Sequence, residues 1–206
     1  MKTRQLILLC CGVTFISTVS ALMCETCLNK TAATCSGRSV KCASAVTSCS
    51  SSLTQVMYEG INIQISEKSC GYPGICHIDY SFTLNDTHIA AKAQCCKADN
   101  CNTDVPQIPP RNLTKNGLKC PYCVHPALGG CTPQHHIQCT GLEKWCIKFS
   151  GHLSLGDSPS PISYEGCATL SACPATTGAN HGNGISCRKA AHDCAEEADP
   201  APPGTS

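Results

Sequence analysis

Alternating apolar and polar residues mark short segments of the chain as β-strands. Ile61, Ile63 and Ile65 alternate with polar residues, which places them on one side of an extended strand. An apolar-rich segment at 52–58 precedes this strand, and the Glu-Gly dipeptide at 59–60 can join the two segments as a β-hairpin. No segment has the sustained period of a helix, so the pattern predicts an all-β protein.

A second hairpin is expected directly after the first. Residues 77–84 also alternate, with four large apolar side chains on one side of the strand. The Asn-Asp pair at 85–86 is typical of a turn, and residues 88–94 then return as the partner strand. The sequence therefore predicts a set of hairpins rather than isolated strands.

Cysteine spacing indicates a tandem repeat. The chain has 206 residues and 21 cysteines, a density typical of a disulfide scaffold. From Cys24 the numbers of residues between successive cysteines are 2, 7, 6, 6, 20 and 5, and from Cys120 they are 2, 7, 7, 6, 20 and 5. This agreement predicts two copies of one domain, at 22–104 and 118–194, joined by a Pro-rich linker at 105–117.

The N-terminal segment predicts export from the cell. A basic start, an apolar run and the small residues at 19–21 are typical of a secretory signal peptide, here 1–21. Its removal would take away Cys10 and Cys11 and leave 19 of the 21 cysteines in an oxidising compartment. The polar, Pro-rich tail at 195–206 carries no signal for a lipid anchor. We therefore expect a soluble extracellular protein.

Candidate chemistry is sparse. The Cys-x2-Cys pairs at Cys24 and Cys120 have the spacing of zinc half-sites, but thiolate sites of this kind belong in reducing compartments. His135 and His136 lack a third ligand at a useful spacing, so we expect solvated loop histidines rather than a metal site or a pH sensor. The formal net charge of +1 and the absence of a basic run argue against nucleic acid as a partner. No catalytic motif occurs, so neither enzymatic activity nor a cofactor is predicted.

Adjacent cysteines at the end of the first copy constrain its disulfides. Cys95 and Cys96 are neighbours, and neighbouring Cα atoms lie about 3.8 Å apart, whereas an unstrained disulfide needs roughly 4.4–6.8 Å. Each must therefore find a separate partner. Cys101 can close a small loop with Cys96, and Cys95 must reach back to an earlier part of the chain. Spacing alone leaves the rest of the connectivity open.

This cysteine pattern, with its Cys-Cys-x4-Cys-Asn ending at Asn102, resembles the three-finger domain of the lymphocyte-antigen-6/urokinase-receptor family. The resemblance covers nearly all of the mature chain and implies a small, disulfide-rich, all-β fold of two tandem three-finger (snake-toxin-like) domains. It also implies that Asn102 hydrogen-bonds to backbone near the cystine knot. For the first copy, the implied disulfides are Cys24–Cys49, Cys27–Cys35, Cys42–Cys70, Cys76–Cys95 and Cys96–Cys101.

The second copy departs from the family pattern because its Cys-Cys-x4-Cys-Asn ending is missing. The pairs expected for this copy are Cys120–Cys146, Cys123–Cys131, Cys139–Cys167 and Cys173–Cys187. Cys194 is then left over, and the alternative is a Cys173–Cys194 pair with Cys187 free. An odd cysteine in a secreted protein suggests an intermolecular bridge. A homodimer linked through Cys194 is therefore one hypothesis, and an unpaired thiol without consequence is the other.

Further segments narrow the resemblance. Residues 112–123, 139–146 and 150–173 look like the corresponding parts of gamma-type phospholipase A2 inhibitors, and the two-domain layout is also similar to the sodefrin-precursor-like pheromone proteins. The first resemblance implies a non-catalytic protein that inhibits a secreted phospholipase A2 by forming a complex and covering its lipid-facing surface. The second implies a secreted signalling protein, pheromone-like or a receptor ligand. A plain antigen-like surface protein is a third alternative.

Two kinds of surface site are expected. N-glycosylation sequons at Asn29, Asn85 and Asn112 fall in predicted loops or in the linker, where glycans can be attached. The linker is expected to be a stiff, exposed strip that docks into a hydrophobic groove of the partner, because the resembling segment of gamma-type inhibitors has been proposed to bind the enzyme. The linker residues concerned are Val105, Pro106, Ile108, Pro109 and Pro110. The alternative is that the linker is only a spacer.

Overall fold

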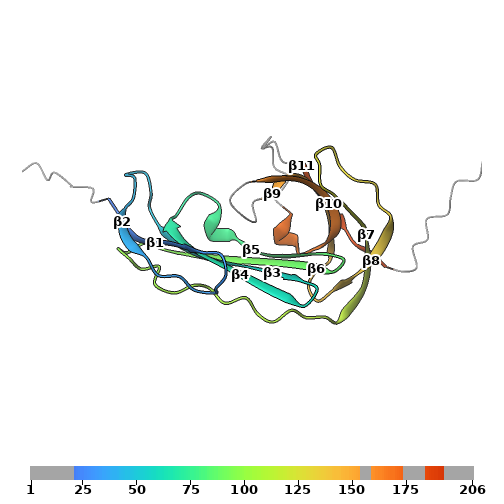
Figure 1. Ribbon diagram of the computed structural model, residues 1–206, viewed down its shortest axis with the longest axis horizontal. Coiled ribbons are helices and arrows are strands. Elements are labelled where there is room, and N and C mark those ends of the chain that lie inside the picture. Colours follow the sequence, from blue (N-terminus) through green and yellow to red (C-terminus); the bar gives the residue numbers. More distant parts are fainter. Residues whose placement is uncertain (1–20, 154–158, 174–183, 193–206) are drawn as a thin grey trace, which may run out of the picture.

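The computed structural model describes residues 21–153, 159–173 and 184–192 (Figure 1). The predicted signal peptide up to residue 20, Cys194 and the tail at 195–206 lie outside the described residues. The described chain contains twelve β-strands and two short 3-10 helices, and all of the strand pairings are antiparallel. The prediction of an all-β, disulfide-rich fold is therefore confirmed. No helix in this part of the chain is long and apolar enough to span a membrane.

Two of the predicted hairpins form the centre of the first copy. β3 pairs with β4 around Glu59 and Gly60, which both have positive φ angles (48° and 82°), as a two-residue hairpin turn requires. β5 pairs with β6 around Asn85, which has a φ angle of 47°. The strand order is β5-β6-β3-β4-β1-β2. The elements of this copy are β1 (Met23–Asn29), β2 (Arg38–Lys41), β3 (Cys49–Tyr58), β4 (Ile61–Cys70), η1 (Ile75–His77), β5 (Asp79–Leu84) and β6 (Thr87–Cys96).

The second copy continues the sheet of the first. Its strand β10 pairs with β5, so that Ala168 lies opposite Phe82 and Cys167 lies opposite Thr83. Beyond β10 the order is β9 and then β11, while β7 pairs with β10, β8 and β12. The elements of this copy are β7 (Lys115–His125), β8 (His135–Thr140), β9 (Trp145–Leu153), β10 (Ser160–Ala168), η2 (Leu170–Ala172), β11 (Gly184–Lys189) and β12 (Ala191–His192).

A hydrophobic core lies between the two copies, on one face of β5 and β6. The ring of Phe82 stacks on Tyr164 with ring centroids 5.3 Å apart, and Tyr164 stacks on Phe149 at 4.9 Å. Such aromatic pairs contribute about 0.5–1.5 kcal/mol beyond the burial of their area. The eight buried members of this core are Val56, Phe82, Leu84 and Ile89 of the first copy, and Ile147, Phe149, Tyr164 and Ala168 of the second. The two repeats therefore pack as one unit.

The second copy also holds the opposite face of β5, through a buried carboxylate. Glu143 lies in the loop before β9, and its Oε1 accepts hydrogen bonds from Thr83 Oγ1 at 2.9 Å and Ser81 Oγ at 3.3 Å. The same oxygen lies 3.4 Å from Nδ1 of the buried His88. Arg111 of the linker donates to Thr83 Oγ1 at 3.3 Å. β5 is therefore in contact with other parts of the chain on both of its faces. The contacts are apolar on one face and polar on the other.

Candidate protein-binding surface

Nine disulfides hold the described chain, and they join the same cysteines as the expected pairs. Their Cα–Cα distances of 5.3–5.9 Å lie within the normal range for disulfides. Cys95 and Cys96 take separate partners, and Cys173 pairs with Cys187 rather than with Cys194. Two groups of three sulfur atoms lie close together, around Cys24 and around Cys120. All six are oxidised in disulfides, so they offer no thiolate to a metal ion.

Asn102 ties the end of the first copy to its cystine knot. Its side chain is buried, and its Nδ2 donates to the backbone oxygens of Glu25 at 2.9 Å and Ser50 at 3.0 Å. Its Oδ1 accepts a hydrogen bond from the backbone N–H of Glu25 at 3.1 Å. A single side chain therefore satisfies backbone groups of two strands, as the family resemblance implies.

The linker is not the exposed strip that the sequence suggests. It runs beneath the sheet of the first copy (Figure 1), and Val105 and Pro106 are buried. Lys68 donates to the backbone oxygen of Thr103, and Gln94 donates to that of Asp104 at 3.1 Å. These bonds hold the start of the linker against the sheet. The first apolar residues of the linker are buried there as a result. The expected exposure is therefore wrong at Val105 and Pro106.

The remaining predicted surface residues are accessible. Ile108 is half-buried, and Pro109 and Pro110 are exposed. Among the sequons, Asn85 and Asn112 are exposed and Asn29 is half-buried, and glycosylation at these positions remains a prediction.

The histidine pair lies on β8, where neighbouring side chains point to opposite faces of the strand. The ring of His135 packs against the ring of Tyr122, with centroids 4.9 Å apart. His135 and His136 therefore do not converge on one metal ion.

An apolar surface stands out on the first copy, next to the core between the copies. Residues directly opposite each other in antiparallel strands share a face of the sheet. Ile63 lies opposite Val56, Val56 lies opposite Ile89, and Ile89 lies opposite Phe82. The second copy covers the last three of these residues but leaves Ile63 exposed. β4 is thus the uncovered continuation of the apolar face that holds the repeats together.

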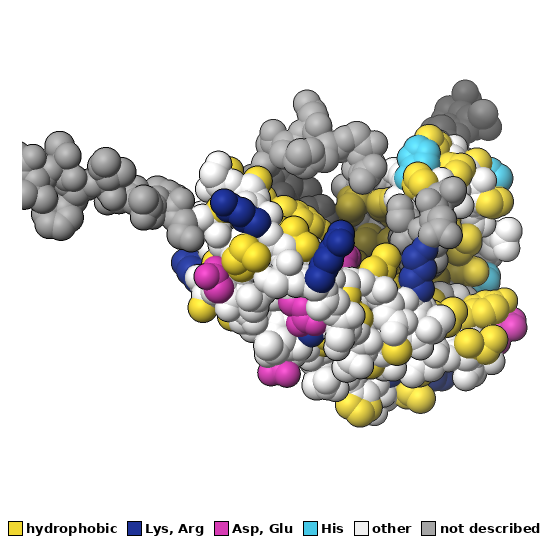
Figure 2. Space-filling model, turned by 60° about the vertical axis from the view of Figure 1, so that its left-hand side comes forward, with side chains coloured by type: hydrophobic (Ala, Val, Ile, Leu, Met, Phe, Trp, Pro, Cys, Tyr) yellow, Lys and Arg dark blue, Asp and Glu magenta, His cyan; other side chains and the backbone are white. Residues whose placement is uncertain are grey.

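Four large side chains make up this surface, which we call the apolar stripe. Their exposed fractions are 57% for Leu28, 46% for Tyr58, 60% for Ile61 and 43% for Ile63. Tyr58 and Ile61 are cross-strand neighbours at the tip of the β3–β4 hairpin, and Leu28 lies on β1 opposite Glu67 of β4. Figure 2 shows hydrophobic side chains in the hollow between the two lobes, and scattered ones elsewhere on the face that it displays.

Three tyrosines of the first copy have raised pKa values. Burial raises the pKa of Tyr80, and the neighbouring Tyr72 adds to that effect. Burial and then the Glu67 carboxylate raise the pKa of the exposed Tyr72. A hydrogen bond to Glu59 raises the pKa of Tyr58. Each tyrosine stays neutral and presents an apolar ring with a polar tip, a combination that is frequent in protein interfaces.

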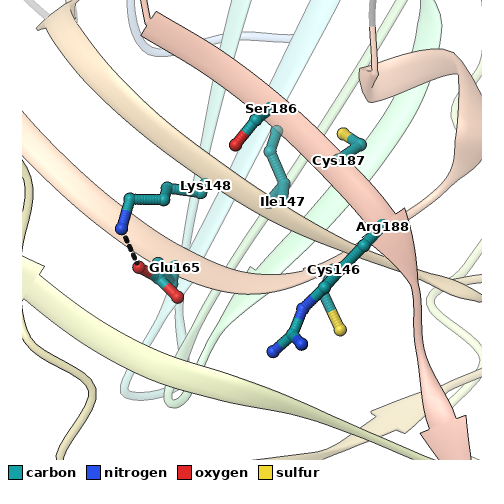
Figure 3. Close-up of a pocket in the computed structure, with 7 residues that line it drawn as sticks. All are labelled: Cys146, Ile147, Lys148, Glu165, Ser186, Cys187 and Arg188. Atoms are coloured by element: carbon teal, nitrogen blue, oxygen red, sulfur yellow. Dashed lines mark ion pairs between the residues drawn. The ribbon is translucent and has the colours of Figure 1, made fainter.

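Two pockets of the described chain lie on different copies. One, of about 280 Å³, lies on the second copy, where Lys148 Nζ pairs with Glu165 Oε1 at 2.8 Å and Arg188 lies at its edge (Figure 3). The other, of about 390 Å³, lies beside the linker and includes Lys68. The cysteines that line both pockets are in disulfides, so neither pocket pairs a free thiol with a base.

Lys68 has a structural role in the second pocket. Its Nζ lies 2.8 Å from Glu25 Oε2, and this hydrogen bond holds the pKa of Glu25 below its usual range.

Sequence reasoning missed the apolar stripe. The alternation of Ile61, Ile63 and Ile65 was visible, and it correctly placed the three on one face. The pattern does not indicate how far along that face the second copy reaches, because this depends on the pairing of β5 with β10.

Both halves of the chain match known protein families. A family model described as phospholipase A2 inhibitor matches residues 22–103, and one described as u-PAR/Ly-6 domain matches residues 116–198. "Phospholipase A2 inhibitor NAI" of Notechis ater is 30% identical over 173 residues, which cover 82% of this chain and 85% of that protein. A gamma-type phospholipase A2 inhibitor from Elaphe climacophora is 30% identical with the same coverage of both chains.

Two further similarities are weaker. The urokinase plasminogen activator surface receptor of Bos taurus is 26% identical over 85% of this chain and 52% of its own length. Among solved structures, mouse TEX101 is 16% identical with a TM-score of 0.34, covering 80% of this chain and 96% of that one.

Proposed function

Since this chain belongs to the u-PAR/Ly-6 family that includes the gamma-type phospholipase A2 inhibitors, we propose that it is a secreted, non-catalytic protein that inhibits a phospholipase A2 by forming a complex with it. The inhibitor names of its relatives support the class of partner. The predicted signal peptide and the nine disulfides support an extracellular location.

The observation that carries this proposal is the apolar stripe. Contiguous exposed apolar side chains on a soluble protein mark interaction surfaces. The stripe is a strand surface rather than a deep pocket, so it suits another protein's surface better than a small molecule. Its rigidity comes from the β3–β4 hairpin and from the disulfide between Cys42 and Cys70 at the end of β4. A rigid surface loses little conformational entropy when a partner docks on it.

The mechanism that follows is steric. An enzyme that works on lipid aggregates presents an apolar surface to them, and that surface would pack on the stripe instead. Burial of apolar area from both partners drives the association at roughly 25 cal/mol per Å², less the cost of immobilising the two proteins. The enzyme would then be unable to adsorb to its substrate, although its catalytic groups would be untouched.

The test is hydrolysis of phospholipid vesicles by a panel of secreted phospholipases A2, titrated with the purified, oxidised protein. We expect saturable inhibition near equimolar ratio. Hydrolysis of a short-chain, monomeric phospholipid by the same enzyme should be affected much less. The Ile61→Thr/Ile63→Thr variant should weaken inhibition at least tenfold, because each change removes exposed apolar area but keeps a β-branched residue on the strand.

Two control variants separate the stripe from other surfaces. Leu142→Thr removes a side chain that is 79% exposed on the second copy, beside the buried Glu143, and should leave inhibition unchanged. Ile108→Thr tests the accessible part of the linker, which lies against the opposite face of the sheet from the stripe. Equal inhibition by the wild type and the double isoleucine variant would contradict the proposed binding surface. No inhibition of any enzyme in the panel would contradict the function and favour a secreted signal.

A further inference from the structure

Carboxylates border the apolar stripe. Glu59 forms the turn between β3 and β4, Asp86 lies in the turn between β5 and β6, and Glu67 follows Ile63 along the same face of β4. A hydrogen bond with Glu59, and then the charges of Glu59 and Asp86, raise the pKa of Tyr58, whereas burial and then the charge of Glu67 raise the pKa of Tyr72. Glu59 and Asp86 therefore lie close to Tyr58 of the stripe, and Glu67 lies close to the exposed Tyr72.

These carboxylates are not neutralised within the described chain. All three are exposed, and none forms an ion pair with any described residue. The lysines of strands β3 to β6 are Lys68 and Lys92, and both alternate to the opposite face of the sheet. There Lys68 pairs with Glu25 at 2.8 Å and Lys92 pairs with Asp79 at 3.4 Å. Strands β3 to β6 thus contribute negative charge, and no cation, to the side of the stripe.

An apolar strip bordered by carboxylates has the same chemistry as the surface of an anionic lipid aggregate, which presents apolar chains beside negative headgroups. Proteins that adsorb to such aggregates carry apolar side chains ringed by lysine and arginine, because the headgroups attract those cations. The same ring would meet the three carboxylates here. The continuity of the stripe with the core between the copies indicates that this face already packs against an apolar protein surface.

We infer that the stripe and its carboxylates select a phospholipase A2 whose lipid-facing surface is cationic, by presenting a substitute for an anionic lipid surface. This inference rests on the proposed function and specifies, in addition, the charge of the partner's lipid-facing surface. The apolar residues supply the affinity. The carboxylates Glu59, Glu67 and Asp86 speed the encounter with a cationic enzyme and oppose the docking of an acidic one, since like charges across an interface are costly.

The experiment compares a strongly basic and an acidic secreted phospholipase A2, both immobilised for association kinetics with the full-length mature protein. The basic enzyme should bind at least tenfold faster at 20 mM than at 500 mM NaCl, because salt screens steering charges. The variant Glu59→Gln/Glu67→Gln/Asp86→Asn should lower the association rate at low salt by about threefold to tenfold and reduce its dependence on salt. For the acidic enzyme, the same variant should bind better than the wild type.

A matched control removes one charge from elsewhere on the surface. Glu67→Gln should slow association, whereas Asp104→Asn, an exposed change at the start of the linker, should not. Far-ultraviolet circular dichroism and non-reducing mass analysis verify that each variant folds with its disulfides.

Three outcomes distinguish a failure of this inference from a failure of the proposed function. Faster binding of the basic enzyme, lost in the triple variant, supports the inference. Inhibition of both enzymes with equal rates in the wild type and the triple variant overturns it but leaves the inhibitor function intact. Absence of binding to either enzyme, together with no inhibition in the vesicle assay, overturns both.

Discussion

The core between the copies makes a specific prediction about cooperativity. Phe82 belongs to the first copy, is buried, and stacks on Tyr164 of the second at 5.3 Å. If the two repeats form one folding unit, Phe82→Ala must destabilise the second copy as well as the first. The sole tryptophan of the chain, Trp145 on β9, reports on the second copy alone.

The expected magnitude follows from the burial of Phe82. Truncation of a buried phenylalanine to alanine costs about 3–5 kcal/mol, which includes the cavity it leaves. For a protein of this size each kcal/mol lowers the melting temperature by about 2–4 °C, so the loss amounts to roughly 6–20 °C. Ile63→Ala is the matched control, because Ile63 lies on the same face but is uncovered. Its effect should stay within about 0.5 kcal/mol.

The assay is thermal or guanidinium unfolding of the oxidised protein, followed by Trp145 fluorescence and by circular dichroism. We expect both signals of Phe82→Ala to shift together to a lower midpoint. An unshifted fluorescence transition beside a lowered circular dichroism transition would show that the repeats unfold separately. That result would refute the reasoning, because the shared core would then contribute nothing to the second copy.

The remaining predictions concern polar contacts. Glu143→Ala should lower the free energy of unfolding by about 1–3 kcal/mol, since it leaves the hydroxyl groups of Thr83 and Ser81 without their acceptor; guanidinium titration beside Leu142→Ala, an exposed neighbour, checks this. Glu25 has a pKa lowered by its hydrogen bond from Lys68, so it stabilises the fold above the usual carboxyl range, and this contribution is lost as pH falls through the lowered pKa. The difference in the free energy of unfolding between the wild type and Glu25→Gln should therefore be larger at pH 7 than at pH 2.5. Asn102→Ala should destabilise the first copy by about 1–3 kcal/mol in the same titration, because three backbone groups lose their partner.

Local signals account for what the sequence could predict. The alternation in 61–66 and 77–84 placed the central strands, and the Glu-Gly pair at 59–60 placed a turn that requires positive φ angles. Cysteine spacing showed the repeat because a disulfide scaffold tolerates few changes in the separation of its bridges. The pairing itself came from the family resemblance, and the structure has the same nine bridges in the described chain.

Contacts between distant segments account for what the sequence could not predict. Glu143 lies between the exposed residues Leu142 and Lys144, so a surface position would be expected for it. It is instead buried against Thr83, 60 residues away in the sequence. Val105 looked accessible in a Pro-rich linker, but the bond from Lys68 to Thr103 draws this segment onto the sheet. In each case the decisive partner lies on another strand, and no local pattern identifies it.

The same sheet face has two uses in this molecule, and the charges around it explain how both are possible. Only 4% of the residues of this chain are aromatic, and Phe82 of one repeat packs against Tyr164 of the other in the core between the copies. The second repeat reaches only part of this face, which leaves Ile61 and Ile63 exposed on β4. An exposed apolar strand surface would invite self-association, and identical copies carrying the same unpaired carboxylates around it repel one another. A partner with cationic side chains would be attracted instead, so the carboxylates that oppose self-association also favour a cationic enzyme.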